Sequence, residues 1–69
     1  MSRLVKRSFA LAGHRTSVAL EPEFWLALEE LAAAERRPLS ALVAALDAER
    51  PADHPLASVL RVHALVHRR

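Results

Sequence analysis

Residues 15–20 alternate between two faces, one of which is mainly hydrophobic. A period of two that includes β-branched residues is typical of a β-strand. The two faces of this predicted strand are Thr16, Val18 and Leu20 on one side and Arg15, Ser17 and Ala19 on the other.

Alternation also occurs upstream, but with the opposite parity. Phe9 and Leu11 occupy odd positions, so the apolar face changes across Gly13. One extra residue in a bulge, or a tight turn, exchanges the two faces of a strand. A hairpin that folds residues 8–12 onto 15–20 is one solution. We favour a single short strand, because an isolated two-stranded hairpin is marginal in water. That strand then needs a pairing partner from outside the chain.

Three helices are predicted after the strand. Pro22 suits the first turn of a helix, and the acidic residues beside it complement the helix dipole. Pro38 ends this first helix, and a second is predicted over about residues 39–49. A break follows, in which Asp53 is a candidate cap for a third helix over roughly residues 55–67.

Composition favours a protein that is not stable as a single chain. The chain has 69 residues and no Cys, yet 52% of its residues are hydrophobic. Chains this short rarely bury enough apolar surface alone, and disulfides and thiolate zinc sites are excluded here. We therefore expect an oligomer that shares its core between chains.

The charges suggest a polyanionic partner. The net charge is only +2, but residues 1–20 and 54–69 carry cations and no acid, while residues 21–53 hold all eight acids. Basic ends are a candidate footprint on nucleic acid. No apolar run is long enough to span a bilayer, and the N-terminal apolar run is too short for a signal peptide, so we expect a cytoplasmic protein without membrane contact.

The chain has no combination of residues typical of an enzyme. Its one Gly excludes a Gly-rich phosphate loop, and no nucleophile and base are placed together. His63 and His67 have the i, i+4 spacing of helical metal ligands, but no Cys or nearby carboxylate completes a site. We expect no catalytic residues, no cofactor and no metal.

The order of elements resembles the ribbon-helix-helix proteins of the Arc and Met repressor class. The resemblance is carried by RTSVAL, EPEFWLALEELAAAERR and PLSALVAALDAER. The string GHRTS…LEPEFW, with LSALVAALD and LASVLRVHAL downstream, resembles a small bacterial branch of that family. The resemblance implies a mainly α fold with one short strand. Two chains would form a homodimer with an intermolecular two-stranded antiparallel ribbon and an extra C-terminal helix.

Three regions and three groups of site residues follow from the resemblance. The regions are a basic, partly extended N-terminal arm (1–13), a ribbon-helix-helix core (14–50), and a linker with a C-terminal helix (51–69). In this class the ribbon enters the major groove of DNA. The implied base-reading residues are Arg15, Ser17 and Ala19. The implied phosphate-binding residues are Arg3, Lys6, Arg7, Arg37, Leu39 and Ser40. The implied dimer core is Thr16, Val18, Leu20, Phe24, Trp25, Leu28, Leu42, Val43 and Leu46.

The function implied is that of a homodimeric DNA-binding protein, a transcriptional regulator acting on double-stranded DNA. An alternative is a dimeric protein–protein adaptor or antitoxin-like module that keeps the fold with little or no sequence-specific DNA binding. Ala19 has no hydrogen-bonding group, and Pro38 stands where many relatives have a capping Ser or Thr. Both features favour the alternative, in which the third helix binds a protein partner. Dimer and tetramer both stay open.

Overall fold

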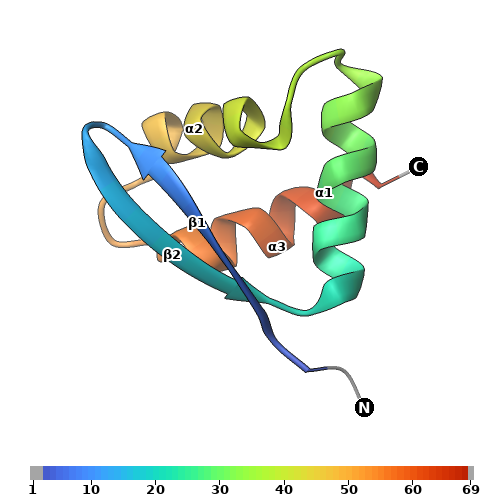
Figure 1. Ribbon diagram of the computed structural model, residues 1–69, viewed down its shortest axis with the longest axis horizontal. Coiled ribbons are helices and arrows are strands. Elements are labelled where there is room, and N and C mark those ends of the chain that lie inside the picture. Colours follow the sequence, from blue (N-terminus) through green and yellow to red (C-terminus); the bar gives the residue numbers. More distant parts are fainter. Residues whose placement is uncertain (1–2, 69) are drawn as a thin grey trace.

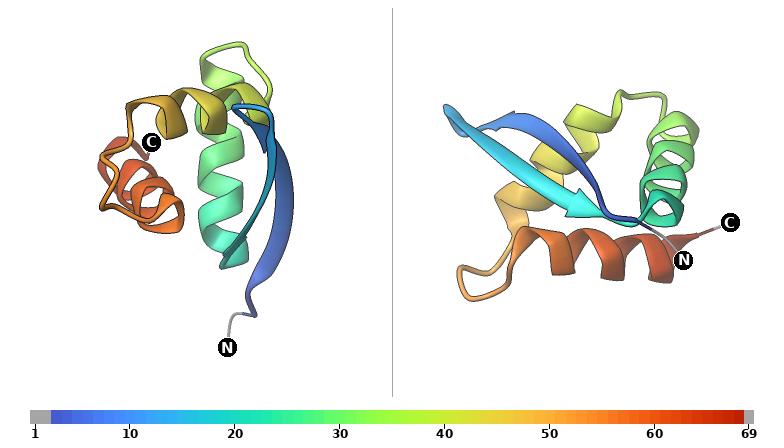
Figure 2. Two further views of the ribbon diagram at one scale, coloured as in Figure 1. Left: turned by 90° about the vertical axis from the view of Figure 1, so that its left-hand side faces the viewer. Right: turned by 60° about the horizontal axis from the view of Figure 1, so that its bottom comes forward.

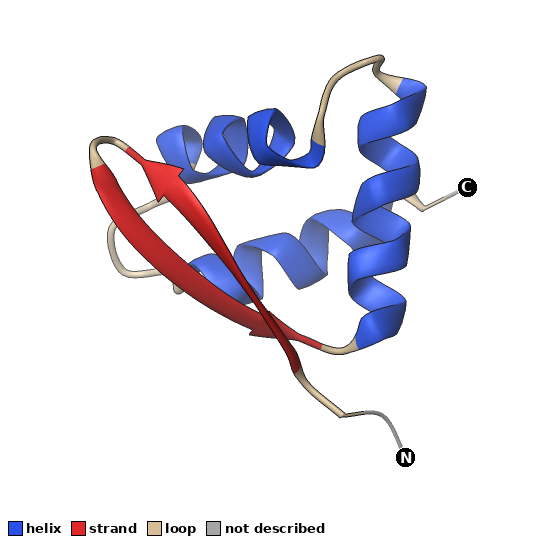
Figure 3. Ribbon diagram, viewed as in Figure 1, coloured by secondary structure: helices blue, strands red, loops and turns tan. Residues whose placement is uncertain are grey.

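A β-hairpin followed by three helices makes up the fold of the protein (Figures 1 and 3). The computed structural model describes residues 3–68. The elements are β1 (Val5–Leu11), β2 (His14–Leu20), α1 (Pro22–Ala34), α2 (Leu39–Glu49) and α3 (Leu56–His67). The hairpin lies on one side of the molecule and the helices lie on the other (Figure 2, left). One face of the hairpin is therefore covered by helices and the opposite face is open.

The hairpin corrects two sequence-based expectations. β1 pairs antiparallel with β2, with Val5 opposite Leu20 and Leu11 opposite His14. The expectation of one short strand is therefore wrong, and so is the expectation that a second chain supplies the other strand of the ribbon. The hairpin alternative is correct, although strands Val5–Leu11 and His14–Leu20 are longer than the predicted segments 8–12 and 15–20. An isolated hairpin is marginal in water, but this one packs its inner face on three helices.

A two-residue turn explains the change of parity at Gly13. Ala12 and Gly13 connect the strands and have φ angles of 50° and 82°. Positive φ at both central residues is what a type I′ turn requires, and this turn matches the twist of a hairpin. The turn carries the apolar face from odd positions in β1 to even positions in β2.

Ala12 is the strained residue of this turn, because an L residue with a Cβ pays about 1–2 kcal/mol in the left-handed region. Ala12→Asn gives the Asn-Gly pair that type I′ turns prefer. We expect a gain of about 1 kcal/mol, seen in thermal unfolding as a rise of about 4–8 °C. Ala10→Asn, the same exchange on the open face of β1, is the control and should give no gain. An unchanged melting temperature in Ala12→Asn would contradict the turn geometry.

A single core is built from all five elements of one chain. Its buried side chains are Phe9, Leu11, Val18, Leu20, Trp25, Leu28, Leu31, Ala32, Leu42, Val43, Leu60 and Ala64. Most of the expected dimer-core residues are among them, while Thr16, Phe24 and Leu46 are half-buried. The core also includes Leu60 and Ala64 of α3, which were not among the expected core residues, and the contribution of a partner chain stays a prediction.

The bounds of α2 and α3 agree with the pattern of apolar residues, but α1 ends at Ala34, before the expected end at Pro38, and one expected cap is absent. α2 spans Leu39–Glu49, as expected. α3 has Pro55 at its N-cap and no side-chain cap, so the expected capping role of Asp53 is wrong. The Asp53 carboxylate instead lies 3.9 Å from the His54 ring. Among residues 3–68, no helix is long and apolar enough to cross a membrane.

Candidate nucleic-acid interface

The open face of the hairpin is formed by alternate residues of both strands. β1 contributes Lys6, Ser8 and Ala10, and β2 contributes Arg15, Ser17 and Ala19. All are exposed except Ala19, which is half-buried. The structure thus brings the expected base-reading residues together on one face, and it adds three residues of β1 beside them. Their contact with DNA stays a prediction at this point.

The strand register sets the layout of this open face. Ser8 lies opposite Ser17, with their hydroxyl oxygens 3.1 Å apart. Lys6 lies opposite Ala19, and Ala10 lies opposite Arg15. The two cations therefore occupy opposite ends of the face, each beside a small side chain, with the two hydroxyls between them. No side chain of the open face is acidic.

Arg7 does not belong to the open face. It lies in β1 with its guanidinium 3.0 Å from a Glu29 carboxylate oxygen and 5.0 Å from the centre of the Trp25 ring. We expected Arg7 to lie in a basic arm and to bind phosphate, but β1 includes it and its side chain turns toward α1. Arg3 is exposed ahead of β1. The exposed cations near the open face are thus Arg3, Lys6 and Arg15.

Trp25 holds the start of β1 against α1. Its indole N–H donates a hydrogen bond of 2.8 Å to the Val5 carbonyl oxygen. Its ring centre lies 5.9 Å from that of Phe9. These contacts join the first strand to the first helix, and they fix which residues of β1 face outward.

The first turn of α2 lies on the hairpin side of the molecule (Figure 2, left). Pro38 is the N-cap and its carbonyl accepts the N–H groups of Ala41 and Leu42 at 3.0 and 3.3 Å. The N–H groups of Leu39 and Ser40 precede the first intrahelical bonds, and such groups favour an anion. Both residues were expected to bind phosphate.

Arg37 lies just before this turn and is already paired. Its Nη2 is 2.6 Å from a Glu35 carboxylate oxygen. Its Nε is buried, with no hydrogen-bond partner among the described residues. A phosphate would have to compete with Glu35 for this guanidinium. We conclude that the backbone of α2 is better placed than Arg37 to hold an anion.

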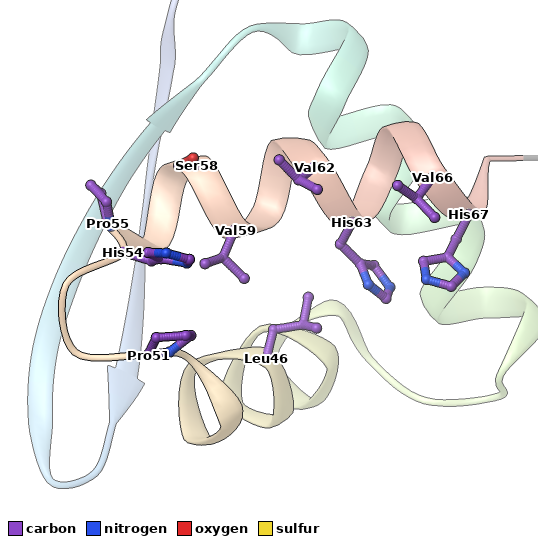
Figure 4. Close-up of a pocket in the computed structure, with 10 residues that line it drawn as sticks. All are labelled: Leu46, Pro51, His54, Pro55, Ser58, Val59, Val62, His63, Val66 and His67. Atoms are coloured by element: carbon purple, nitrogen blue, oxygen red, sulfur yellow. The ribbon is translucent and has the colours of Figure 1, made fainter.

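A second surface is the groove between α2 and α3 (Figure 4), a cavity of about 480 Å³. Residues that line it include Leu46, Val59, Val62, His63, Val66 and His67. Figure 4 shows the two imidazoles side by side at one end, and their ring centres are 4.4 Å apart. Burial lowers the pKa of His63, and the neighbouring His67 lowers it further. With leucine and valine side chains along its length, the surface is largely apolar.

The histidine pair His63 and His67 has a spacing that metal ligands on a helix can have. In residues 3–68, no group of three or more His, Cys, Asp or Glu side chains is placed to hold a metal ion. His63 and His67 are close, but a structural zinc site uses four ligands and a catalytic one uses three. We therefore interpret the pair as part of the groove lining.

The chain was compared with models of known protein families, with curated proteins and with solved structures. The family model described as a ribbon-helix-helix domain matches residues 4–68. The match extends over the hairpin and all three helices. No curated protein and no solved structure gave a match.

Proposed function

Because the chain belongs to the ribbon-helix-helix domain family, whose members typically bind DNA as dimers, we propose that it is a homodimeric DNA-binding transcriptional regulator. The β-hairpin would enter the major groove of double-stranded DNA with its open face toward the bases. One observation carries this proposal. The open face has a cation at each end, paired hydroxyls at its centre and no acid.

The dimensions and chemistry of the open face support the proposal. The major groove is about 12 Å wide and admits a two-stranded ribbon. Arg15 can bond both acceptors of guanine, Ser17 can donate or accept, and the Ala19 methyl can touch a thymine methyl. Small side chains beside the cations let the backbone approach the bases closely.

Phosphate contacts would come from the same side of the molecule. The N–H groups of Leu39 and Ser40 at the start of α2 offer a site for one backbone phosphate. Arg3 lies ahead of β1 and is exposed, so it would contact a neighbouring phosphate. Such contacts fix the position of the ribbon but carry no sequence information.

The homodimer in this proposal is held by helices, since the ribbon is complete within one chain. α3 exposes Val62, Leu65 and Val66, and α1 exposes Leu26. Apolar side chains of this size gain free energy when a second chain covers them. The size of the domain also favours association, because small cores are only marginally stable alone.

Arg15→Ala tests the proposed DNA face. If Arg15 reads a base, we expect Arg15→Ala to weaken binding by about 1–3 kcal/mol. If Arg15 contacts a phosphate instead, the slope of log affinity against log salt concentration should fall by about 1. The measurement is fluorescence anisotropy against mixed genomic duplexes over a salt series. Arg68→Ala removes an exposed cation at the far end of α3 and is the matched control. Equal binding by wild type and Arg15→Ala would contradict the assignment of the ribbon.

The groove between α2 and α3 favours a second candidate function. It is largely apolar and flanked by exposed Val62 and Val66, which suits the helix or strand of a protein partner. Under this alternative the chain is an adaptor or antitoxin-like module. A folded protein that binds no DNA at low salt would favour it.

A further inference from the structure

The two strands of the hairpin carry related sequences. β1 reads VKRSFAL and β2 reads HRTSVAL. A shift of nine residues superposes SFAL on SVAL, and it places Lys6 on Arg15. The sequence therefore contains a short repeat whose two copies are the two strands.

The strand register relates the two copies by a two-fold rotation. Ser8 lies directly opposite Ser17. In an antiparallel pair, an axis perpendicular to the ribbon passes between two opposed residues. Rotation about this axis carries each residue of β1 onto the residue nine positions later in β2. The register and the repeat are separate observations, and they give the same axis.

The symmetry holds on the open face and breaks on the covered one. On the open face a cation, a serine and an alanine occur twice in equivalent places. On the covered face Phe9 corresponds to Val18, but Arg7, which is paired with Glu29, corresponds to Thr16. The covered face packs on three different helices, and the axis of the hairpin does not relate these helices to one another. The open face has no such neighbour and keeps the repeat.

We propose that one chain presents a complete DNA-reading ribbon with pseudo-two-fold symmetry. Lys6 and Ser8 are then specificity-determining residues equivalent to Arg15 and Ser17. The ligand is a DNA duplex that contains a short inverted repeat, read by a single hairpin. This inference rests on the proposed DNA binding and adds to it the residues of β1 and the symmetry of the site.

The geometry sets the spacing of the repeat. Lys6 and Arg15 each lie two residues from the central serine pair, in opposite directions along the ribbon. With about 3.4 Å per residue and about 4.8 Å between strands, their Cα atoms are about 14 Å apart. This distance corresponds to about four base pairs at 3.4 Å each. Both side chains favour guanine, so we expect two guanines, one on each DNA strand, about four base pairs apart.

Selection of binding sites from a random 20-base-pair duplex library tests this inference on the full chain. Wild type is expected to enrich an inverted repeat. Lys6→Ala should lose base preference in one half of the repeat and Arg15→Ala in the other, each with a loss of affinity of about 5-fold or more. Lys6→Arg makes the cations of the two strands identical, so it should retain binding and select more symmetric sites. Arg68→Ala is the surface-charge control, and circular dichroism verifies the fold of each variant.

The outcomes separate this inference from the proposed function. Suppose Lys6→Ala selects the wild-type sites with wild-type affinity while Arg15→Ala is impaired. DNA binding by β2 would then stand, and the symmetric ribbon would be overturned. A folded wild-type protein that enriches no sequence and binds no duplex would overturn both. Loss of preference in opposite halves supports the symmetric ribbon.

Discussion

Trp25→Ala is expected to leave the protein unfolded at room temperature. Trp25 is 1% exposed and joins α1 to β1 through the hydrogen bond to Val5 and the contact with Phe9. Truncation of a buried Trp costs about 3–5 kcal/mol. A core of this size supplies only about 3–5 kcal/mol of net stability. The loss therefore equals the whole stability of the domain.

Thermal unfolding followed by far-ultraviolet circular dichroism measures this effect. The neighbouring Leu26→Ala is the control, since Leu26 is 58% exposed and its removal leaves the core unchanged. Its melting curve should match that of the wild type if the chain is measured at low concentration. If Trp25→Ala unfolds cooperatively, with a melting temperature within a few degrees of that of the wild type, then Trp25 does not hold the hairpin to α1.

Val18→Asp and Ser17→Asp are expected to have opposite effects, although the residues are adjacent. Val18 is 4% exposed on the covered face of β2, and a carboxylate there would be buried without a partner. Val18→Asp should therefore unfold the chain. Ser17 is exposed on the open face, so Ser17→Asp should stay folded. It should lose DNA binding, because it places a negative charge where the phosphates and base acceptors approach.

Circular dichroism measures the folding of both variants, and fluorescence anisotropy with a labelled duplex measures their DNA binding. Ser17→Ala is the neutral control, which removes the hydroxyl without adding charge. If Val18→Asp is folded and Ser17→Asp is unfolded, the assignment of the two faces of β2 is reversed. If Ser17→Asp folds and binds DNA as the wild type does, the open face does not meet DNA.

The helices could be predicted from the sequence because their limits are local. Proline at positions 22, 38 and 55 and the apolar spacing between them place all three helices close to their observed bounds. The outward position of Arg15, Ser17 and Ala19 follows from the alternation in β2 alone. These parts of the fold can be predicted from neighbouring residues alone, because they do not depend on contacts between distant parts of the chain.

The sequence ranks the hairpin below a single strand because the stability of the hairpin is not local. Ala12-Gly13 is a weaker turn sequence than Asn-Gly, and a two-stranded ribbon by itself is marginal. What stabilises it is the packing of Phe9 and Leu11 on the helices, which the alternation does not reveal. The repeat of SFAL and SVAL was the sequence feature that could have indicated two equivalent strands.

The positions of the basic residues in β1 depend on this missed pairing. Once β1 is a strand, Lys6 faces outward and Arg7 faces α1, where it meets Glu29 from 22 positions later in the chain. Such a contact cannot be predicted from spacing. The same holds for α3, whose Leu60 and Ala64 are buried in the core with residues from far earlier in the chain.

The most direct test of DNA binding by the open face is amide chemical-shift mapping by NMR, in which labelled protein is titrated with a short duplex. If the hairpin enters the major groove, the largest shifts should fall on the first turn of α2 and on the open-face residues Lys6, Ser8, Arg15 and Ser17. Shifts confined to Val62, Val66 and the rest of α3, with the hairpin amides unmoved, would contradict it.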